Sequence, residues 1–424
     1  MKKDYYRKLD EKVISHNSAN GLNTFVFPKK GFHRSYAMLA VNYGSIDSEF
    51  RTGTESFVPP KGVAHFLEHK VFEQPDGGNA LQIFARHGAT PNAFTSKSMT
   101  CYFFSCTEGF YQNLEVLLNF VTTPYFTAEN VKKEQGIISE EIKMVNDKPG
   151  WRVFENLMSC LYSVYPARDS IIGTKESITR IDRDTLFKCY NTFYIPSNMV
   201  LVTAGDIEAE KVISAAESIL PKDYRKPPER FYGYEPADTK EKYIEKQMQT
   251  PLPVFSLGYR RMCETSGAEG MRARAVWELA AEIIAGNSSP LYSSLYLRGL
   301  INSNFGAGIM TFPGSFCMMF SGESRDPQKV YEEISAFAAK QSLSIDESYF
   351  NRIKKSYYGM TLRNLDMFDA LCREQVSCCF DGYMYYDFIN EIENIEIRDI
   401  IECINLAISD DNMALSVISP NKEA

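Results

Sequence analysis

Two histidines and a glutamate stand together in one short segment, His65-Phe66-Leu67-Glu68-His69. The chain has only 5 histidines in 424 residues, so a pair four residues apart is unusual. In a helix, His65, Glu68 and His69 would share one face within about 100°. Two neutral imidazoles can hold one Zn²⁺, and a carboxylate beside the metal can take a proton from the water that the metal acidifies. We therefore predict a zinc site that activates water, in preference to an amphipathic helix with two incidental histidines.

A catalytic zinc site needs three protein ligands and an open position for water, so a third ligand must come from another segment. Residues 129–146 have the pattern of a helix. On it, Glu134 and Glu141 fall on the apolar face, whereas Glu140 falls outside that face. A buried carboxylate needs a partner or a metal. The residues alone leave open whether Glu134 and Glu141 support a metal or face water at the edge of the apolar stripe.

The pattern His-x-x-Glu-His, followed about 70 residues later by Glu-x6-Glu, resembles the insulinase/pitrilysin family of inverted-motif zinc metallopeptidases. The resemblance implies that His65, His69 and Glu141 bind one zinc ion per chain and that Glu68 is the general base. It also implies that Glu134 supports the site from behind a ligand. The expected substrate is a peptide, and the expected activity is that of an endopeptidase.

Two further strings, 134–138 and 286–292, resemble the bacterial two-subunit, processing-peptidase-like branch of that family. The segment Gly88–Thr95 resembles the family's edge strand, in which Asn92 and Ala93 would pair with the backbone of the substrate. Adding a strand in this way binds almost any extended peptide, because main-chain hydrogen bonds carry the contact. On sequence alone, a turn entering an ordinary strand explains the segment equally well.

One part of the family's site is missing from this sequence. Family members usually carry an Arg and a Tyr, seven residues apart in the second domain, that can stabilise the oxyanion. Alignment of Gly299-Leu300 with the family's Gly-Leu places Leu295 at the Arg position and Asn302 at the Tyr position. Arg298 lies three residues away, and its use as a substitute is the less favoured alternative. We predict that a homologous partner subunit carries Arg-x6-Tyr and that the active form is a heterodimer.

The elements that position these residues are expected in two similar halves. Residues 101–105 resemble 317–321, and residues 198–202 resemble 412–416. Both pairs are separated by about 215 residues, close to half the chain, which indicates an ancient duplication. Strands and helices occur without strict alternation, so we predict an α+β fold of two homologous domains.

The domain boundaries follow from composition. A charged, Pro-rich segment, 221–242, is expected to be a linker. Residues 1–220 would form the zinc-binding peptidase domain, and residues 243–424 the homologous domain that lacks the Arg/Tyr pair. Within the first domain, Thr127 is expected to cap the helix that ends near residue 146, and Pro149 is expected to stop it.

The composition of the chain limits which binding partners and which cellular compartment we expect for it. A net charge of −8 argues against non-specific nucleic-acid binding. The sequence contains no run of about 18 apolar residues, so no membrane partner is expected. Ten cysteines without a Cys-x-x-Cys pair, and an N-terminus without an apolar targeting segment, predict reduced thiols and a cytoplasmic protein.

Two alternatives to a zinc endopeptidase remain. The chain could be a non-catalytic scaffold subunit of the same fold, or an unrelated metalloenzyme such as a metal-dependent amidase. Non-catalytic relatives usually carry a broken zinc motif, whereas all five metal-site and base positions are filled here. Metal analysis and digestion of an unstructured peptide distinguish these alternatives.

Overall fold

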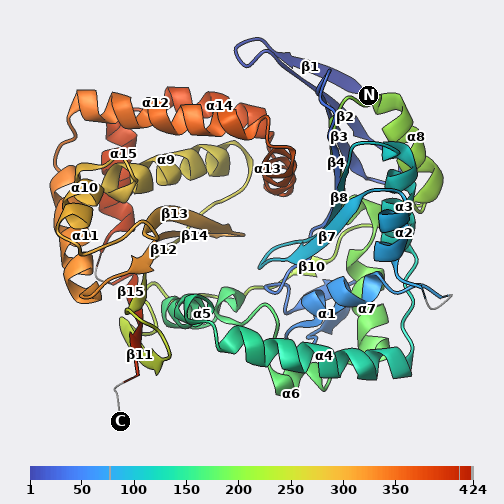
Figure 1. The fold of residues 1–424 in the computed structure, drawn as a ribbon, viewed down its shortest axis with the longest axis horizontal. Helices are drawn as coiled ribbons and strands as arrows, with labels where there is room; N and C mark the ends of the chain where they lie inside the picture. Colours follow the sequence, from blue (N-terminus) through green and yellow to red (C-terminus); the bar gives the residue numbers. More distant parts are fainter. Residues whose placement is uncertain (76–77, 410, 422–424) are drawn as a thin grey trace. The chain divides into compact units, whose positions relative to one another are not determined.

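The computed structural model describes residues 1–75, 78–409 and 411–421. The chain divides into two compact units, whose elements are labelled in Figure 1. Unit 1 comprises Met1–Ile142, Ser170–Tyr232 and Asn364–Phe380, and unit 2 comprises Lys143–Asp169, Gly233–Arg363 and Asp381–Ala424.

Unit 1 is built on a seven-stranded sheet. In their order across the sheet, the strands are β1 (Lys2–Tyr6), β2 (Glu11–Asn17), β3 (Asn23–Pro28), β9 (Met199–Gly205), β4 (Ser35–Val41), β8 (Thr100–Cys106) and β7 (Thr90–Thr95). β3 and β9 run parallel, and the other neighbours run antiparallel. Every residue of β9 is buried, as expected for a central strand covered on both faces. A small sheet holds β10 (Glu229–Arg230), β5 (Phe50–Thr52) and β6 (Glu55–Phe57).

The helices of unit 1 follow the expected capping chemistry. They are α1 (Val63–Val71), α2 (Ala80–Arg86), α3 (Phe110–Thr122), α4 (Ala128–Asn146), α6 (Lys175–Ile178), α7 (Arg183–Phe193), the 3-10 turn η2 (Pro196–Asn198), α8 (Ala209–Ile219) and α13 (Phe368–Phe380). As predicted, the Thr127 hydroxyl accepts from the backbone N–H of Asn130 at 3.1 Å at the start of α4. α4 ends at Asn146, before Pro149, as predicted. Pro149 itself begins α5 (Pro149–Leu161), because the first turn of a helix tolerates a residue without an N–H.

Unit 2 contains a five-stranded sheet flanked by helices. Its strands, in order, are β11 (Tyr243–Met248), β15 (Met413–Pro420), β12 (Val254–Met262), β14 (Ser315–Glu323) and β13 (Gly306–Phe312). Its helices are α5, the 3-10 turn η1 (Pro166–Arg168), α9 (Gly267–Ala285), α10 (Pro290–Leu297), α11 (Pro327–Gln341), α12 (Glu347–Asn364), α14 (Tyr385–Asn394) and α15 (Ile397–Ala407).

The two units repeat one strand topology, which confirms the duplicated α+β fold. The order β3-β9-β4-β8-β7 corresponds to β11-β15-β12-β14-β13, and in each set one parallel pair is followed by three antiparallel pairs. The similar strings fall on equivalent elements. Residues 101–105 lie in β8 and 317–321 in β14, whereas 198–202 enter β9 and 412–416 enter β15.

Two helices are exchanged between the halves of the sequence. α5 lies in the first half but packs on β12 and β15 in unit 2, and α13 lies in the second half but packs on β4 and β9 in unit 1. The compact units are therefore discontinuous, in contrast to the contiguous domains 1–220 and 243–424 expected from the sequence. An apolar helix face shows that a helix must be buried, but it does not show which sheet receives it.

The segment 221–242 is more than a polar connection. It contains β10, and the side chain of Glu235 is fully buried in unit 2. The Glu235 carboxylate accepts from the backbone N–H groups of Ser163, Val164 and Tyr165 at 2.6–2.7 Å. It also lies 3.4 Å from the guanidinium of Arg260 on β12. These contacts join the chain after α5 to the sheet of unit 2.

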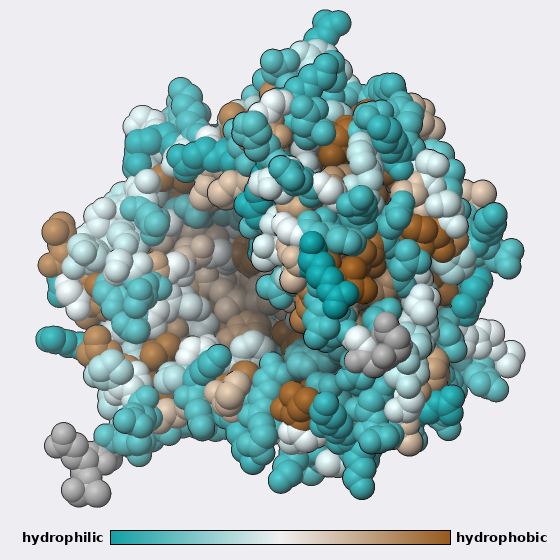
Figure 2. All heavy atoms as spheres, turned by 45° about the vertical axis from the view of Figure 1, so that its right-hand side comes forward, coloured by the Kyte–Doolittle hydropathy of each residue, from teal (hydrophilic) through white to brown (hydrophobic). Residues whose placement is uncertain are grey.

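None of the helices in the described residues is long and apolar enough to cross a bilayer. All ten cysteines are free thiols, and eight of them are buried. Much of the surface visible in Figure 2 is hydrophilic, in keeping with the 24% of charged residues in the chain.

Candidate metal centre

α1 begins at a turn that requires glycine. Gly62 has φ 91°, a left-handed conformation, and a Cβ there would lie 2.7 Å from the carbonyl oxygen of Ile172. After this turn, α1 buries Phe66 and Leu67 completely. The helix therefore has a fixed orientation about its axis.

The structure brings His65, His69 and Glu141 together. His65 and His69 lie one turn apart on α1, and Glu141 lies on α4. One potential ligand atom from each residue lies within 4.8 Å of the others, which no other group of three or more such residues achieves in the described part of the chain. The Nε2 atoms of His65 and His69 are 3.8 Å and 3.5 Å from Oε2 of Glu141.

This geometry fits a zinc ion. Tetrahedral zinc with bonds of about 2.0–2.1 Å separates its ligand atoms by about 3.4 Å, close to the two distances measured to Glu141. Oε2 of Glu141 is buried and has no hydrogen-bond partner among the described residues. A buried carboxylate oxygen in that state needs a cation or a donor, and bound zinc would satisfy it.

Glu134 and Glu140 have opposite environments on α4. Glu134 is only 6% exposed, whereas Glu140 is exposed to solvent. Oε1 of Glu134 lies 3.0 Å from Nδ1 of His69. Because an ionised carboxylate only accepts hydrogen bonds, this contact places the imidazole proton on Nδ1 and leaves Nε2 free for a metal.

The two imidazoles differ in how they are held and charged. Burial, and then the charge of His69, lower the pKa of His65 to about 3, so its ring stays neutral. Burial opposes charging of His69. Its hydrogen bond to Glu134 and the surrounding carboxylates outweigh burial and raise its pKa. Nδ1 of His65 is buried without a hydrogen-bond partner in the described residues, so His65 lacks the carboxylate contact that His69 has with Glu134.

Glu68 lies on the same helix between the two histidines. Burial raises the pKa of Glu68, against the effect of a hydrogen bond from Thr95. The Thr95 hydroxyl donates to Oε2 of Glu68 at 2.6 Å, which holds one carboxylate oxygen. Spacing along the sequence does not reveal this contact, although Thr95 is the last residue of the Gly88–Thr95 segment.

The edge strand β7 carries Asn92 and Ala93. β7 pairs with β8 on one side and is the last strand of the sheet on the other. The backbone N–H of Ala93 donates to Oδ1 of Asn92 at 2.8 Å and is therefore not engaged with β8. In an antiparallel strand the N–H and C=O of one residue point the same way, so both groups of Ala93 face the open edge.

The residues that align with the family's Arg and Tyr positions make other contacts within unit 2. Leu295 is completely buried. The Asn302 amide donates to Glu323 at 2.6 Å, and the Arg298 guanidinium donates to Glu333 at 3.0 Å. Arg298 and Asn302 are therefore each engaged by a carboxylate of the same unit.

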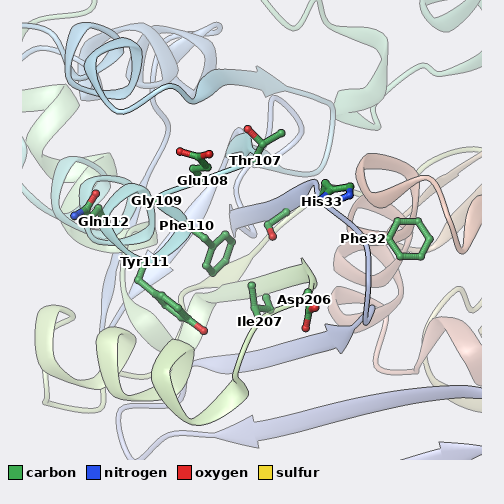
Figure 3. A pocket seen from close by; sticks show the side chains of 11 residues that line it. Phe32, His33, Thr107, Glu108, Gly109, Phe110, Tyr111, Gln112, Asp206 and Ile207 are labelled. Atoms are coloured by element: carbon green, nitrogen blue, oxygen red, sulfur yellow. The ribbon is translucent and has the colours of Figure 1, made fainter.

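A pocket elsewhere in unit 1 has none of the predicted site residues. Its volume is about 600 Å³, and it lies beside the start of α3 (Figure 3). Phe110 and Tyr111 line one part of it, and His33 and Asp206 line another. His33 and Asp206 are both exposed, so the pocket is a surface hollow separate from the candidate metal centre.

Known proteins resemble the chain over its whole length. Residues 28–175 match the family model "Insulinase (Peptidase family M16)", and residues 180–357 match "Peptidase M16 inactive domain". The chain is 34% identical over 422 residues to "Uncharacterized zinc protease YmfH" of Bacillus subtilis (strain 168), covering 98% of each protein. It is 30% identical over 189 residues to "Probable mitochondrial-processing peptidase subunit beta" of Schizosaccharomyces pombe, covering 44% of this chain and 41% of that protein.

Solved structures show the same likeness. A protein of Alicyclobacillus acidocaldarius, described as M16-like, superposes with a TM-score of 0.93 and 32% identity and covers 97% of this chain and 99% of its own. A protease of Helicobacter pylori superposes with a TM-score of 0.84 at 19% identity, covering 97% of this chain and 100% of its own, which supports the fold alone. With both halves matched by its domains and a full-length relative at 34% identity, the chain belongs to the insulinase family of peptidases, M16.

Proposed function

We propose that the chain is the zinc-bearing catalytic subunit of an endopeptidase that cleaves unfolded peptides. The observation that carries this proposal is the convergence of His65, His69 and Glu141 within 4.8 Å, with Glu68 between the two histidines on α1. Each of the three offers an atom that suits zinc, and one more coordination position would remain for water. Membership of a family with named zinc proteases supports the same activity.

The chain's own residues have distinct tasks in this reaction. When bound, zinc would lower the pKa of a water molecule to about 7 and polarise the peptide carbonyl. Glu68 would accept the proton of that water and deliver it to the leaving amine. Thr95 holds Oε2 of Glu68, so Oε1 is the oxygen that would exchange the proton. Glu134 keeps Nε2 of His69 directed at the metal.

The substrate is proposed to bind as an added strand on β7. Both backbone groups of Ala93 face the open edge, and Asn92 is exposed beside them. A peptide would displace the Asn92 side chain from the Ala93 N–H and take its place. Main-chain pairing requires an extended segment without its own strand partner, so unfolded peptides are the expected substrates.

The site is proposed to be completed by a second, homologous chain. Residues 1–220 would supply the zinc and the base, whereas residues 243–424 lack the Arg-x6-Tyr pair. Leu295 is buried at the expected Arg position, so it cannot reach a substrate. The likeness to a protein named as a subunit of a processing peptidase supports a paired assembly. Ten cysteines that all stand as free thiols favour a cytoplasmic setting for that assembly.

The first experiment separates a catalytic role from a scaffold role. Glu68→Gln should retain one zinc per chain by elemental analysis and should lose about 10²–10⁴-fold in peptide cleavage, because an amide cannot accept the water's proton. Cleavage of an unstructured fluorogenic peptide is measured in the complete assembly. Glu140→Gln, which changes an exposed carboxylate on α4, is the matched control and should cleave at the wild-type rate.

Two results would contradict the proposal. Wild-type cleavage by Glu68→Gln would remove Glu68 from the reaction. A zinc-loaded assembly that leaves the peptide intact in both wild type and control would support the non-catalytic scaffold subunit.

A further inference from the structure

A lysine is buried directly behind the candidate metal centre. Lys70 follows His69 on α1, and its side chain has no exposed surface. Its ammonium lies 2.6 Å from Oε1 of Glu73 and 3.9 Å from Oε2 of Glu134, and it donates to the carbonyl oxygen of Asn130 at 3.4 Å. A buried ammonium is costly unless it is paired and hydrogen-bonded, so these contacts decide its position.

The contacts of Lys70 join the two helices that carry the candidate ligands. Glu73 lies three residues after Lys70, just beyond the end of α1, and its Oε2 accepts from the Asn130 amide at 2.9 Å. Asn130 lies one turn before Glu134 on α4. The polar set Lys70, Glu73, Asn130 and Glu134 therefore bridges α1, which carries both histidines, and α4, which carries Glu141.

Both oxygens of Glu134 are constrained from the same helix. His69 contacts Oε1 at 3.0 Å, and Lys70 attracts Oε2 from 3.9 Å. Because His69 and Lys70 are adjacent on α1, they approach the carboxylate from two directions. The carboxylate therefore cannot turn about its terminal bond without losing one of these contacts.

We propose that Lys70 is a positioning residue that raises zinc affinity by holding Glu134 against His69. This inference rests on the proposed zinc site. Lys70 does not touch the metal or the substrate, and it acts through Glu134 and through the link between α1 and α4. It differs from a merely structural ion pair because its removal should change metal binding in a folded protein.

The direction in which zinc affinity changes when Lys70 is removed discriminates between positioning and direct charge repulsion. A lone ammonium near a dication would weaken zinc binding, so its removal would strengthen binding. Here the charge of Lys70 is matched by Glu73 at 2.6 Å, which cancels much of its field at the metal. With that field largely cancelled, Lys70 acts mainly by holding Glu134, so loss of Lys70 should weaken zinc binding.

The test measures the zinc dissociation constant of the full chain by competition with a chromogenic chelator. Removal of an outer partner of a metal ligand typically costs about 10–100-fold in metal affinity, and we expect Glu134→Gln to fall in that range. Lys70→Met, which acts one contact further away, should weaken affinity about 10-fold. Lys133→Met is the matched control, because it removes the same charge from an exposed position beside Glu134 on α4. It should bind zinc as the wild type does.

A double-mutant cycle tests whether Lys70 acts through Glu134. Lys70→Met in the Glu134→Gln background should cause little further loss, because the carboxylate that it positions is already gone. Additive losses, unchanged affinity or tighter binding in the single variant would each overturn the proposal. Failure of wild type to bind zinc would overturn the proposed site itself, which is a distinct result.

Folding is monitored by circular dichroism. If Lys70→Met does not fold, Glu73→Gln provides the second variant, because the Glu73 side chain is 30% exposed and glutamine has nearly the same size and shape. Loss of the Glu73 charge releases the ammonium from its 2.6 Å contact and should also weaken zinc binding. Because the freed ammonium would repel the metal as well, the positioning role requires that this loss disappear in the Glu134→Gln background. Wild-type affinity in a folded Glu73→Gln would count against the positioning role.

Discussion

Glu140 and Glu141 are neighbours in the chain but have different environments on α4. Glu140 is exposed, whereas Oε2 of Glu141 is buried and faces both histidines. Glu141→Gln should therefore lower the zinc content of the purified chain, because an amide oxygen is a weaker, uncharged ligand. Glu140→Gln should leave the zinc content unchanged. Elemental analysis after dialysis against a weak chelator measures both.

Equal zinc content in wild type and both variants would contradict the assignment of Glu141. The two substitutions remove the same charge from adjacent positions, so a general effect of net charge would affect them alike. A loss of zinc in Glu140→Gln, but not in Glu141→Gln, would indicate a different orientation of α4.

At the scale of elements, the placement of α5 on the sheet of unit 2 depends on a buried carboxylate. Glu235 accepts three backbone N–H groups from the turn after α5. Arg260 donates to the carbonyl oxygens of Leu161, Pro236 and Asp238. Together, Glu235 and Arg260 connect the end of α5, the segment 221–242 and β12.

Glu235→Gln should destabilise unit 2. The neutral amide cannot accept all three N–H groups, and Arg260 would be left without a counter-charge inside the unit. Breaking a buried ion pair costs about 3–5 kcal/mol, which should appear as a lower urea midpoint for the transition of unit 2. Glu241→Gln, an exposed position in the same segment, should unfold like the wild type.

Equal urea midpoints for Glu235→Gln and Glu241→Gln would show that the contacts of Glu235 contribute nothing to the stability of α5 on its sheet. Tryptophan fluorescence suits this measurement, because Trp151 lies in the first turn of α5 and Trp277 lies in α9. Both tryptophans belong to unit 2, so the signal reports on that unit.

At the scale of the whole molecule, the proposed active site has zinc ligands and a base but no oxyanion donors from residues 243–424. The isolated, zinc-loaded chain should therefore cleave an unstructured peptide very slowly, since loss of one oxyanion donor costs about 10²–10³-fold. Addition of a homologous chain with Arg-x6-Tyr should restore turnover. Arg298→Ala should have no effect on the restored rate, because Arg298 is paired with Glu333.

Robust turnover by the isolated chain, abolished by Arg298→Ala, would show that one chain type holds the complete site. In that case Arg298 would have to leave Glu333 and reach the substrate. Turnover that is unaffected by Arg298→Ala would assign the missing donors to other residues of this chain.

The sequence by itself determined those features of this protein that depend on neighbouring residues. The spacing of His65, Glu68 and His69 follows from helical periodicity, as does the common face of Glu134 and Glu141. The start of α4 follows from its Thr127 cap. The two similar strings identified the duplication because equivalent strands keep similar apolar patterns, and these strands proved to be β8 with β14 and β9 with β15.

Only the tertiary structure decided which distant groups meet. α5 and α13 each have an apolar face that must be buried, and the structure assigns α5 to unit 2 and α13 to unit 1. The hydrogen bond from Thr95 to Glu68 joins residues 27 positions apart. In the sequence, Lys70 is an ordinary lysine and Glu235 one charge in a polar segment. Burial gives both their roles, because a charge removed from water must find its partners inside the fold.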